Sequence, residues 1–211
     1  MGNSPPFLSV LGDMRYILAA AFVGTALIAA QQSSRPSSSL ERDFVANGKI
    51  SMDLSAGEYR ITGTPENKIR LTWNVRETDR LSNVEARADV RGTEARIVTN
   101  GPMNDFKVAI QIPQRTDLYV RLTAGELRLD RVEGSKDVEL HAGELRIDVN
   151  RADDYHSVDA SIWAGEIHAD PFSIHKEGLF RSFDWKGKGP YTLHARLKAG
   201  EVWLSERTAP R

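Results

Sequence analysis

The chain repeats one twelve-residue phrase five times, and this repetition restricts the fold more than any other feature. The copies are ISMDLSAGEYRI (50–61), LYVRLTAGELRL (118–129), KDVELHAGELRI (136–147), VDASIWAGEIHA (158–169) and LHARLKAGEVWL (193–204). In each copy, apolar residues occupy alternate positions before the Ala-Gly-Glu and again after it. An apolar period of two predicts β-strand rather than helix.

The phase of the alternation changes at the glycine. In the second copy, Leu122 and Ala124 continue one apolar face, but Leu127 and Leu129 continue it beyond Gly125. A straight strand would turn the second apolar set toward solvent, so the chain must absorb one extra residue at the glycine. Glycine tolerates the positive φ or the tight bend that this needs. We therefore predict a β-corner at each Ala-Gly-Glu, with Ala inward and Glu outward.

The spacing of the copies predicts how they are arranged. Gly125, Gly143, Gly165 and Gly200 follow one another at intervals of 18, 22 and 35 residues. A period near 20 is typical of solenoids, and it predicts coils of about three short strands. The longest interval indicates an insertion at residues 173–191. No helical period appears after residue 43.

The segment between Gly57 and Gly125 has a different pattern. Alternating runs at 69–75, 84–90 and 106–112 are separated by turn-like pieces, which predicts an antiparallel, half-buried sheet. The predicted fold class is all-β, a short-coil β-solenoid-like stack with an antiparallel sheet at its N-terminal end. A two-sheet β-sandwich is the alternative.

The N-terminus has the pattern of an export signal. Met14-Arg15 precedes the uncharged apolar run 16–30, which ends in small residues and is short for a membrane span of ~20 residues. We predict a signal peptide at 1–30, with Met14 the more natural initiator. A retained membrane anchor is the alternative. The remaining predicted divisions are a flexible linker at 31–43, a single all-β repeat domain at 44–206 and a tail at 207–211. The protein is then periplasmic or secreted, or anchored and facing outside the cytoplasm.

Composition and motifs exclude several functions. A formal net charge of −1 argues against nucleic-acid binding, and the absence of cysteine excludes disulfides and thiolate chemistry. No nucleophile elbow, P-loop or GxGxxG motif is present. The five histidines do not have the spacing of a known metal motif; they are His141, His156, His168, His175 and His194. We expect no catalytic residue, no cofactor and no metal.

The corner glutamates form the most regular polar feature. Stacking in register would align Glu126, Glu144 and Glu166, with Glu201 as a further member, ~4.8 Å apart. Arg128, Arg146 and His168 follow two residues later on the same face. A solvated row of alternating charge is the favoured interpretation, and a Ca²⁺-binding row of carboxylates is the alternative.

Several aromatic residues lie beside charged positions. By the parity of the strands, Trp163, Trp203 and Tyr119 point outward and Tyr59 points inward. Outward aromatic rings suit glycan stacking or a protein contact. We favour instead that the segment 180–191, which contains Trp185, covers Trp163 and Trp203.

Three segments resemble the bacterial putative-adhesin family of secreted and envelope β-solenoid-like domains. They are IQIPQRTDLYVRLTAGELRL (110–129), VELHAGELRI (138–147) and GPYTLHARLKAGEVWL (189–204). The family repeat has a small residue, Gly and an acid before an alternating strand, usually Gly-Asp where this chain has Gly-Glu. The resemblance spans residues 46–205 and implies no catalytic residues.

These observations predict a non-catalytic extracytoplasmic domain, an adhesin-like envelope scaffold or a binding module for protein or glycan. Self-association is compatible with it, and membrane contact requires that 16–30 be retained. One alternative is a small β-helix enzyme acting on polysaccharide, which would need paired carboxylates at a cleft. The other is a membrane-anchored domain that senses the state of the envelope.

Overall fold

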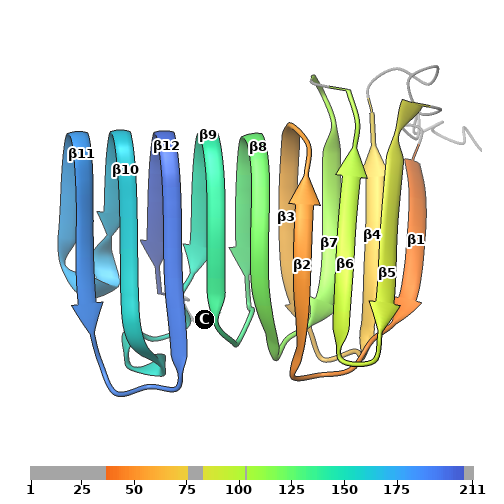
Figure 1. Cartoon of the computed structure of the whole chain (residues 1–211), viewed down its shortest axis with the longest axis horizontal. Helices are drawn as coiled ribbons and strands as arrows, with labels where there is room; N and C mark the ends of the chain where they lie inside the picture. The colour runs from red at the N-terminus through yellow and green to blue at the C-terminus, as the bar shows by residue number, and fades with distance from the viewer. Residues whose placement is uncertain (1–36, 76–82, 103, 207–211) are drawn as a thin grey trace, which may run out of the picture. The chain divides into compact units, whose positions relative to one another are not determined.

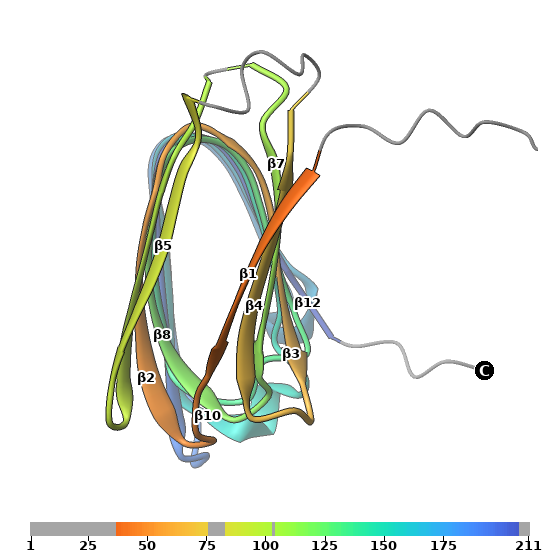
Figure 2. The same cartoon turned by 90° about the vertical axis from the view of Figure 1, so that its right-hand side faces the viewer.

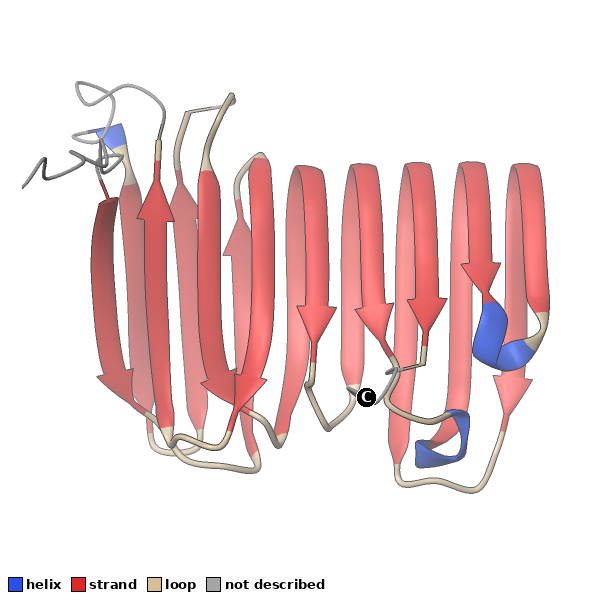
Figure 3. Ribbon diagram, turned by 180° about the vertical axis from the view of Figure 1, so that it is seen from behind, coloured by secondary structure: helices blue, strands red, loops and turns tan. Residues whose placement is uncertain are grey.

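The computed structural model describes residues 37–75, 83–102 and 104–206, and these are nearly all β-strand. The strands are β1 (Ser37–Asp43), β2 (Gly48–Leu54), β3 (Gly57–Thr64), β4 (Lys68–Asn74), β5 (Glu85–Arg91), β6 (Glu94–Asn100), β7 (Lys107–Pro113), β8 (Thr116–Asp130), β9 (Lys136–Asp148), β10 (Tyr155–Ala169), β11 (Ile174–Lys186) and β12 (Tyr191–Ser205). Two short 3-10 turns, η2 (Ala152–Asp154) and η3 (Asp170–Phe172), flank β10 (Figure 3). The all-β prediction is confirmed. Among the described residues, no helix has the length and apolar character needed to span a membrane.

All twelve strands belong to one mixed sheet that bends over on itself (Figures 1 and 2). The first half of β8 pairs with β2, and its second half pairs with β3. The long strands therefore cross from one layer to the other at Ala-Gly-Glu. We call the layer that contains β5, β6, β2 and the first halves of the repeat strands the front layer. The back layer contains β1, β4, β7, β3 and the second halves.

The hydrophobic core lies between the two layers. Met52, Val120 and Val138 pair in register on the front layer and are fully buried. On the back layer, Ile61 and Leu129 do the same. Each repeat copy thus contributes one buried row before its corner and another after it, as the alternation predicted.

The predicted β-corners are present. Gly125, Gly143, Gly165 and Gly200 have φ between +121° and +134°, which L side chains rarely adopt. The glycines also stack on one another: a Cβ added at Gly143 would lie 1.9 Å from the carbonyl oxygen of Gly125. Glycine is needed at this position for its backbone angle and for its missing side chain.

The expected inward direction of the corner alanines is wrong. Ala142 and Ala199 are exposed, and Ala124 and Ala164 are half-buried. Each alanine lies at the bend itself, where the strand turns around the edge of the core instead of running along it.

The structure departs from the predicted short-coil, solenoid-like stack in the order and the make-up of its coils. A solenoid stacks successive coils in chain order, but the strand order here is β8-β9-β12-β10-β11. The antiparallel pairing of β11 with β10 reverses the chain, which returns as β12 between β9 and β10 and pairs parallel with both. Each coil is one bent strand with a short return, not three short strands. The two layers are those of the sandwich alternative, joined by strands that continue across the corner.

The N-terminal part is mixed rather than antiparallel. β2 runs parallel to β6 and β3 runs parallel to β7, whereas β4–β7 and β5–β6 are antiparallel. The run 94–100, which the alternating pattern did not single out, forms β6.

Part of the predicted linker is folded. Residues 37–43 form β1, which pairs with β4 along its whole length, so the domain begins before Phe44. A polar sequence suits this strand because it lies at the edge of the sheet, with Leu40 packed against the core. The predicted signal peptide, residues 31–36 and the predicted tail lie outside the described residues.

Candidate functional site

A groove of about 630 Å³ crosses the outer side of the front layer just before the corner. One wall is the row Arg121, Glu139 and Arg196, contributed by β8, β9 and β12. The opposite wall is the row Thr123, His141 and Lys198, all exposed. Between these rows the strands at Leu122, Leu140 and Leu197 form its floor, and the side chains of these leucines are buried in the core behind it. We call this feature the corner groove.

The charged wall of the corner groove is held in place by ion pairs. Glu139 lies between two arginines, 3.4 Å from Arg121 and 3.0 Å from Arg196. Arg196 also pairs with Asp137 at 2.7 Å. The guanidinium groups are therefore positioned in advance, and they keep donors free for a ligand since each has five N–H bonds.

The corner groove leads to exposed aromatic residues. Trp163 lies in β10 beside Lys198 of β12, because the residues that flank them pair in register. Its side chain is 57% exposed, and Phe180, 71% exposed, meets its edge at a ring-centroid distance of 5.8 Å. The expected cover of Trp163 by the segment 180–191 is therefore wrong. Phe180 extends the exposed apolar surface and does not bury it.

The corner glutamates form a row on the back layer. Glu126 pairs with Glu144, Glu144 with Glu201, and Glu201 with Glu166 in the register of neighbouring strands. The prediction placed Glu201 at the end of this row. It lies instead between Glu144 and Glu166, because β12 is inserted between β9 and β10. Each glutamate contacts the side chain two residues later, and these partners are Arg128, Arg146, Trp203 and His168. The contacts favour the charge-paired interpretation, and Ca²⁺ binding remains an untested alternative.

The row two residues beyond the glutamates becomes aromatic toward β11. The Arg146 guanidinium lies over the Trp203 ring at 5.3 Å, and Trp203 stacks on His168 at 3.7 Å with an interplanar angle of 7°. Trp203 is thus packed by its neighbours in the sheet, not by residues 180–191 as expected. Tyr119 is half-buried on the front layer under Arg121, and Tyr59 is buried, as its parity predicted.

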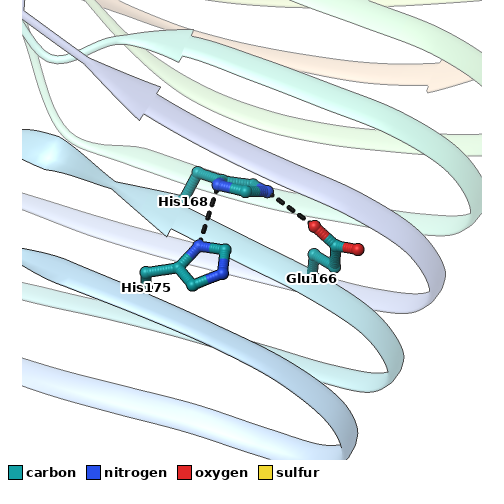
Figure 4. Close-up of side chains that lie close together, drawn as sticks. All are labelled: Glu166, His168 and His175. Atoms are coloured by element: carbon teal, nitrogen blue, oxygen red, sulfur yellow. Dashed lines mark hydrogen bonds and ion pairs between the residues drawn. The ribbon is translucent and has the colours of Figure 1, made fainter.

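Sequence reasoning missed a cluster at the β10–β11 hairpin (Figure 4). His168 pairs with His175 across the hairpin, and their Nδ1 atoms are 3.0 Å apart. Nε2 of His168 is 2.9 Å from a carboxylate oxygen of Glu166. The seven-residue separation of the histidines matches no metal motif. The signal was Asp-Pro at 170–171, which marks a reversal that brings the two strands together.

A buried lysine was also missed. Lys136 is 1% exposed in the register column of Leu118 and Leu193, where the other copies place an apolar residue. Its Nζ donates to the Tyr155 hydroxyl at 2.7 Å and to the Gly134 carbonyl at 3.0 Å. Burial lowers the pKa of Lys136 to about 8, against the opposing effect of nearby carboxylates, chiefly Asp148.

No family model and no curated protein matches the chain. Among solved structures, a putative cell adhesion protein from Clostridium sporogenes matches with a TM-score of 0.53 at 14% identity, covering 82% of this chain and 100% of that one. The likeness shows the fold alone. A putative adhesin from Parabacteroides merdae has a TM-score of 0.31 at 10% identity, covering 80% of each chain. Another from Bacteroides fragilis has 0.28 at 9% identity, covering 82% of this chain and 98% of that one.

Proposed function

We propose that the chain is a non-catalytic, extracytoplasmic binding module that holds a glycan in the corner groove and against Trp163. The observation that carries the proposal is that the exposed Trp163 lies beside Lys198, which lines the corner groove. Sugars bind where an aromatic face meets fixed hydrogen-bond donors and acceptors. Trp163 supplies the ring, and the row Arg121, Glu139 and Arg196 supplies the polar groups.

The charges of the corner groove favour a glycan over a nucleic acid or a strongly acidic partner. Glu139 lies between its two arginines, and Asp137 also pairs with Arg196, so the wall presents both signs of charge rather than a basic stripe. The groove also crosses several neighbouring strands in one direction. This shape fits an extended chain of repeating units.

The carboxylates in the corner groove support binding rather than hydrolysis. A glycosidase needs a carboxylic acid with a raised pKa opposite a second carboxylate. Glu139 is ion-paired with Arg121 and Arg196, and Asp53 is 2.7 Å from Arg96. Both carboxylates are thus held by guanidinium groups, which suits a positioned binding wall.

The envelope location rests on two observations. Residues 16–30 have the apolar pattern of an export signal, and a protein of the same fold from Clostridium sporogenes is described as a putative cell adhesion protein. A binding module of this kind would work at the cell surface or in the periplasm, where polysaccharide is abundant.

The test is binding of the labelled full chain to an array of immobilised polysaccharides, including peptidoglycan, chitin, mannan and alginate. We expect retention on at least one of them, with affinity lowered tenfold or more in Trp163→Ala and in Arg121→Ala. Arg60→Ala is a matched control, because its side chain is 58% exposed, as is that of Arg121, but it lies on the back layer.

Two outcomes would overturn the proposal. One is the absence of retention on every polysaccharide while the protein is folded. The other is equal loss of binding in Arg60→Ala and Arg121→Ala, which would place the contact outside the corner groove. Retention only on an envelope protein fraction, sensitive to Trp163→Ala, would replace the glycan with a protein partner.

A further inference from the structure

Three side chains at the β10–β11 hairpin converge as in a metal site. Glu166 and His168 point the same way from β10, and His175 faces them from β11 (Figure 4). Their possible ligand atoms all lie within 4.8 Å of one another. The cluster is on the back layer, separate from the corner groove.

Glu166 determines which nitrogen of His168 is available. An ionised carboxylate has only acceptor atoms, so Nε2 of His168, 2.9 Å from the Glu166 oxygen, is the N–H donor of this hydrogen bond. The lone pair of the neutral ring is then on Nδ1, which faces Nδ1 of His175 at 3.0 Å. A carboxylate that orients a histidine in this way is the usual outer partner of a metal-binding imidazole.

The surroundings keep His168 in position and leave His175 accessible. Trp203 stacks on one face of the His168 ring, and the side chain of His168 is only 16% exposed. The His175 ring packs against His168 at 4.5 Å, while His175 as a residue is exposed. An ion at this point would therefore have one rigid ligand, one adjustable ligand and further positions open to water.

We infer that His168 and His175 bind a divalent transition-metal ion through their Nδ1 atoms, with Glu166 as the positioning residue. The 3.0 Å between the nitrogens lets both bond to one ion. Two metal–nitrogen bonds of about 2.05 Å span about 2.9 Å when they meet at 90° and about 3.3 Å at the tetrahedral angle, so His175 has to move less to reach the right-angled arrangement. The right-angled arrangement is that of tetragonal Cu²⁺ or Ni²⁺, and Cu²⁺ binds most strongly in the general order of affinities.

The experiment is titration of the full chain, free of any histidine tag, with CuSO₄ by calorimetry and by electron paramagnetic resonance. We expect one Cu²⁺ per chain, a spectrum with nitrogen ligands, and affinity at least tenfold above that for Zn²⁺. His175→Ala should lower the affinity 100-fold or more. Glu166→Gln should lower it roughly 10- to 100-fold and leave the nitrogen signature in place.

The matched control is His156→Ala, which removes another exposed histidine, at the start of β10 and outside the cluster. It should leave Cu²⁺ binding unchanged. The inference is overturned if the folded chain binds no Cu²⁺, or if His175→Ala and His156→Ala bind it equally. Because His175 is exposed, its variant tests the site even if His168→Gln, which loses the Trp203 stack, is unstable.

Discussion

At the residue scale, Gly143 and Gly92 separate two reasons for a glycine. Both have positive φ, +131° at Gly143 and +61° at Gly92. A Cβ at Gly143 would lie 1.9 Å from the Gly125 carbonyl oxygen, whereas one at Gly92 would meet nothing within 4 Å. A side chain would strain the backbone at both positions. Only at Gly143 would it also clash with the neighbouring corner.

We therefore expect Gly143→Ala to lower the free energy of unfolding by about 3 kcal/mol or more, and Gly92→Ala by about 1–2 kcal/mol. Glu144→Gln removes one surface ion pair and should change it by less than about 1 kcal/mol. Urea unfolding of the three variants measures these differences. Equal losses in the two glycine variants would show that the corners are not closely stacked.

How far single residues could be predicted depends on how local their cause is. The corner glycines were predictable because a phase shift is visible within one copy of the phrase. The exposure of Ala142 was not, since it depends on where the crest of the bend lies relative to the core. The pairing of His168 with His175 needed the register of the β10–β11 hairpin, which no single-strand pattern contains.

At the scale of elements, β12, the last strand of the described residues, lies inside the sheet and not at its edge. Terminal segments generally fray, but β12 has β9 on one side and β10 on the other. β1 and β11 lie at the ends of the strand order and pair on one side only. The amides of a strand should therefore be protected from hydrogen exchange according to the position of the strand in the sheet, interior or edge, and not according to its position in the sequence.

Hydrogen exchange followed by mass spectrometry tests this order. We expect peptides from β12 (residues 191–205) to exchange among the slowest in the domain, with those from β11 and β1 faster by at least tenfold. Exchange of β12 as fast as β11 would contradict the interior position of β12 in the sheet.

The strands were easier to predict than their order. Alternation identified the five repeat copies, and the equal spacing of apolar residues around each corner determined their mutual register. Because all copies share this spacing, any copy can pair with any other in that register, and the spacing does not determine the strand order. What places β12 between β9 and β10 is the reversal at the β10–β11 hairpin, and that depends on connections rather than on strand patterns.

At the scale of the whole molecule, the buried Lys136 links stability to pH. In the unfolded chain a lysine keeps its proton up to its ordinary pKa of 10.5, whereas in the folded protein Lys136 loses it at about 8. Between these values the unfolded state binds more protons, so stability rises with pH. Below about pH 8 both states are protonated, and the desolvation penalty is fully present.

We expect the free energy of unfolding of the parent chain, relative to Lys136→Met, to rise by roughly 2–3 kcal/mol between pH 8 and pH 10. The difference between the two chains should be nearly constant from pH 6 to pH 7.5. Urea unfolding across this pH range measures it, and Lys49→Met, which replaces an exposed lysine, is the control. Parallel curves for the parent and Lys136→Met would show that Lys136 is solvated in the folded protein.

The insertion of β12 between β9 and β10 has a consequence for synthesis. A ribosome makes the chain from its N-terminus, so β9 and β10 exist before the strand that joins them has emerged. Until residues 191–205 are available, β9 and β10 each lack the partner strand that lies between them in the folded sheet. The native strand order is therefore completed only after residues 191–205 have been made, whatever the order in which the other strands pair.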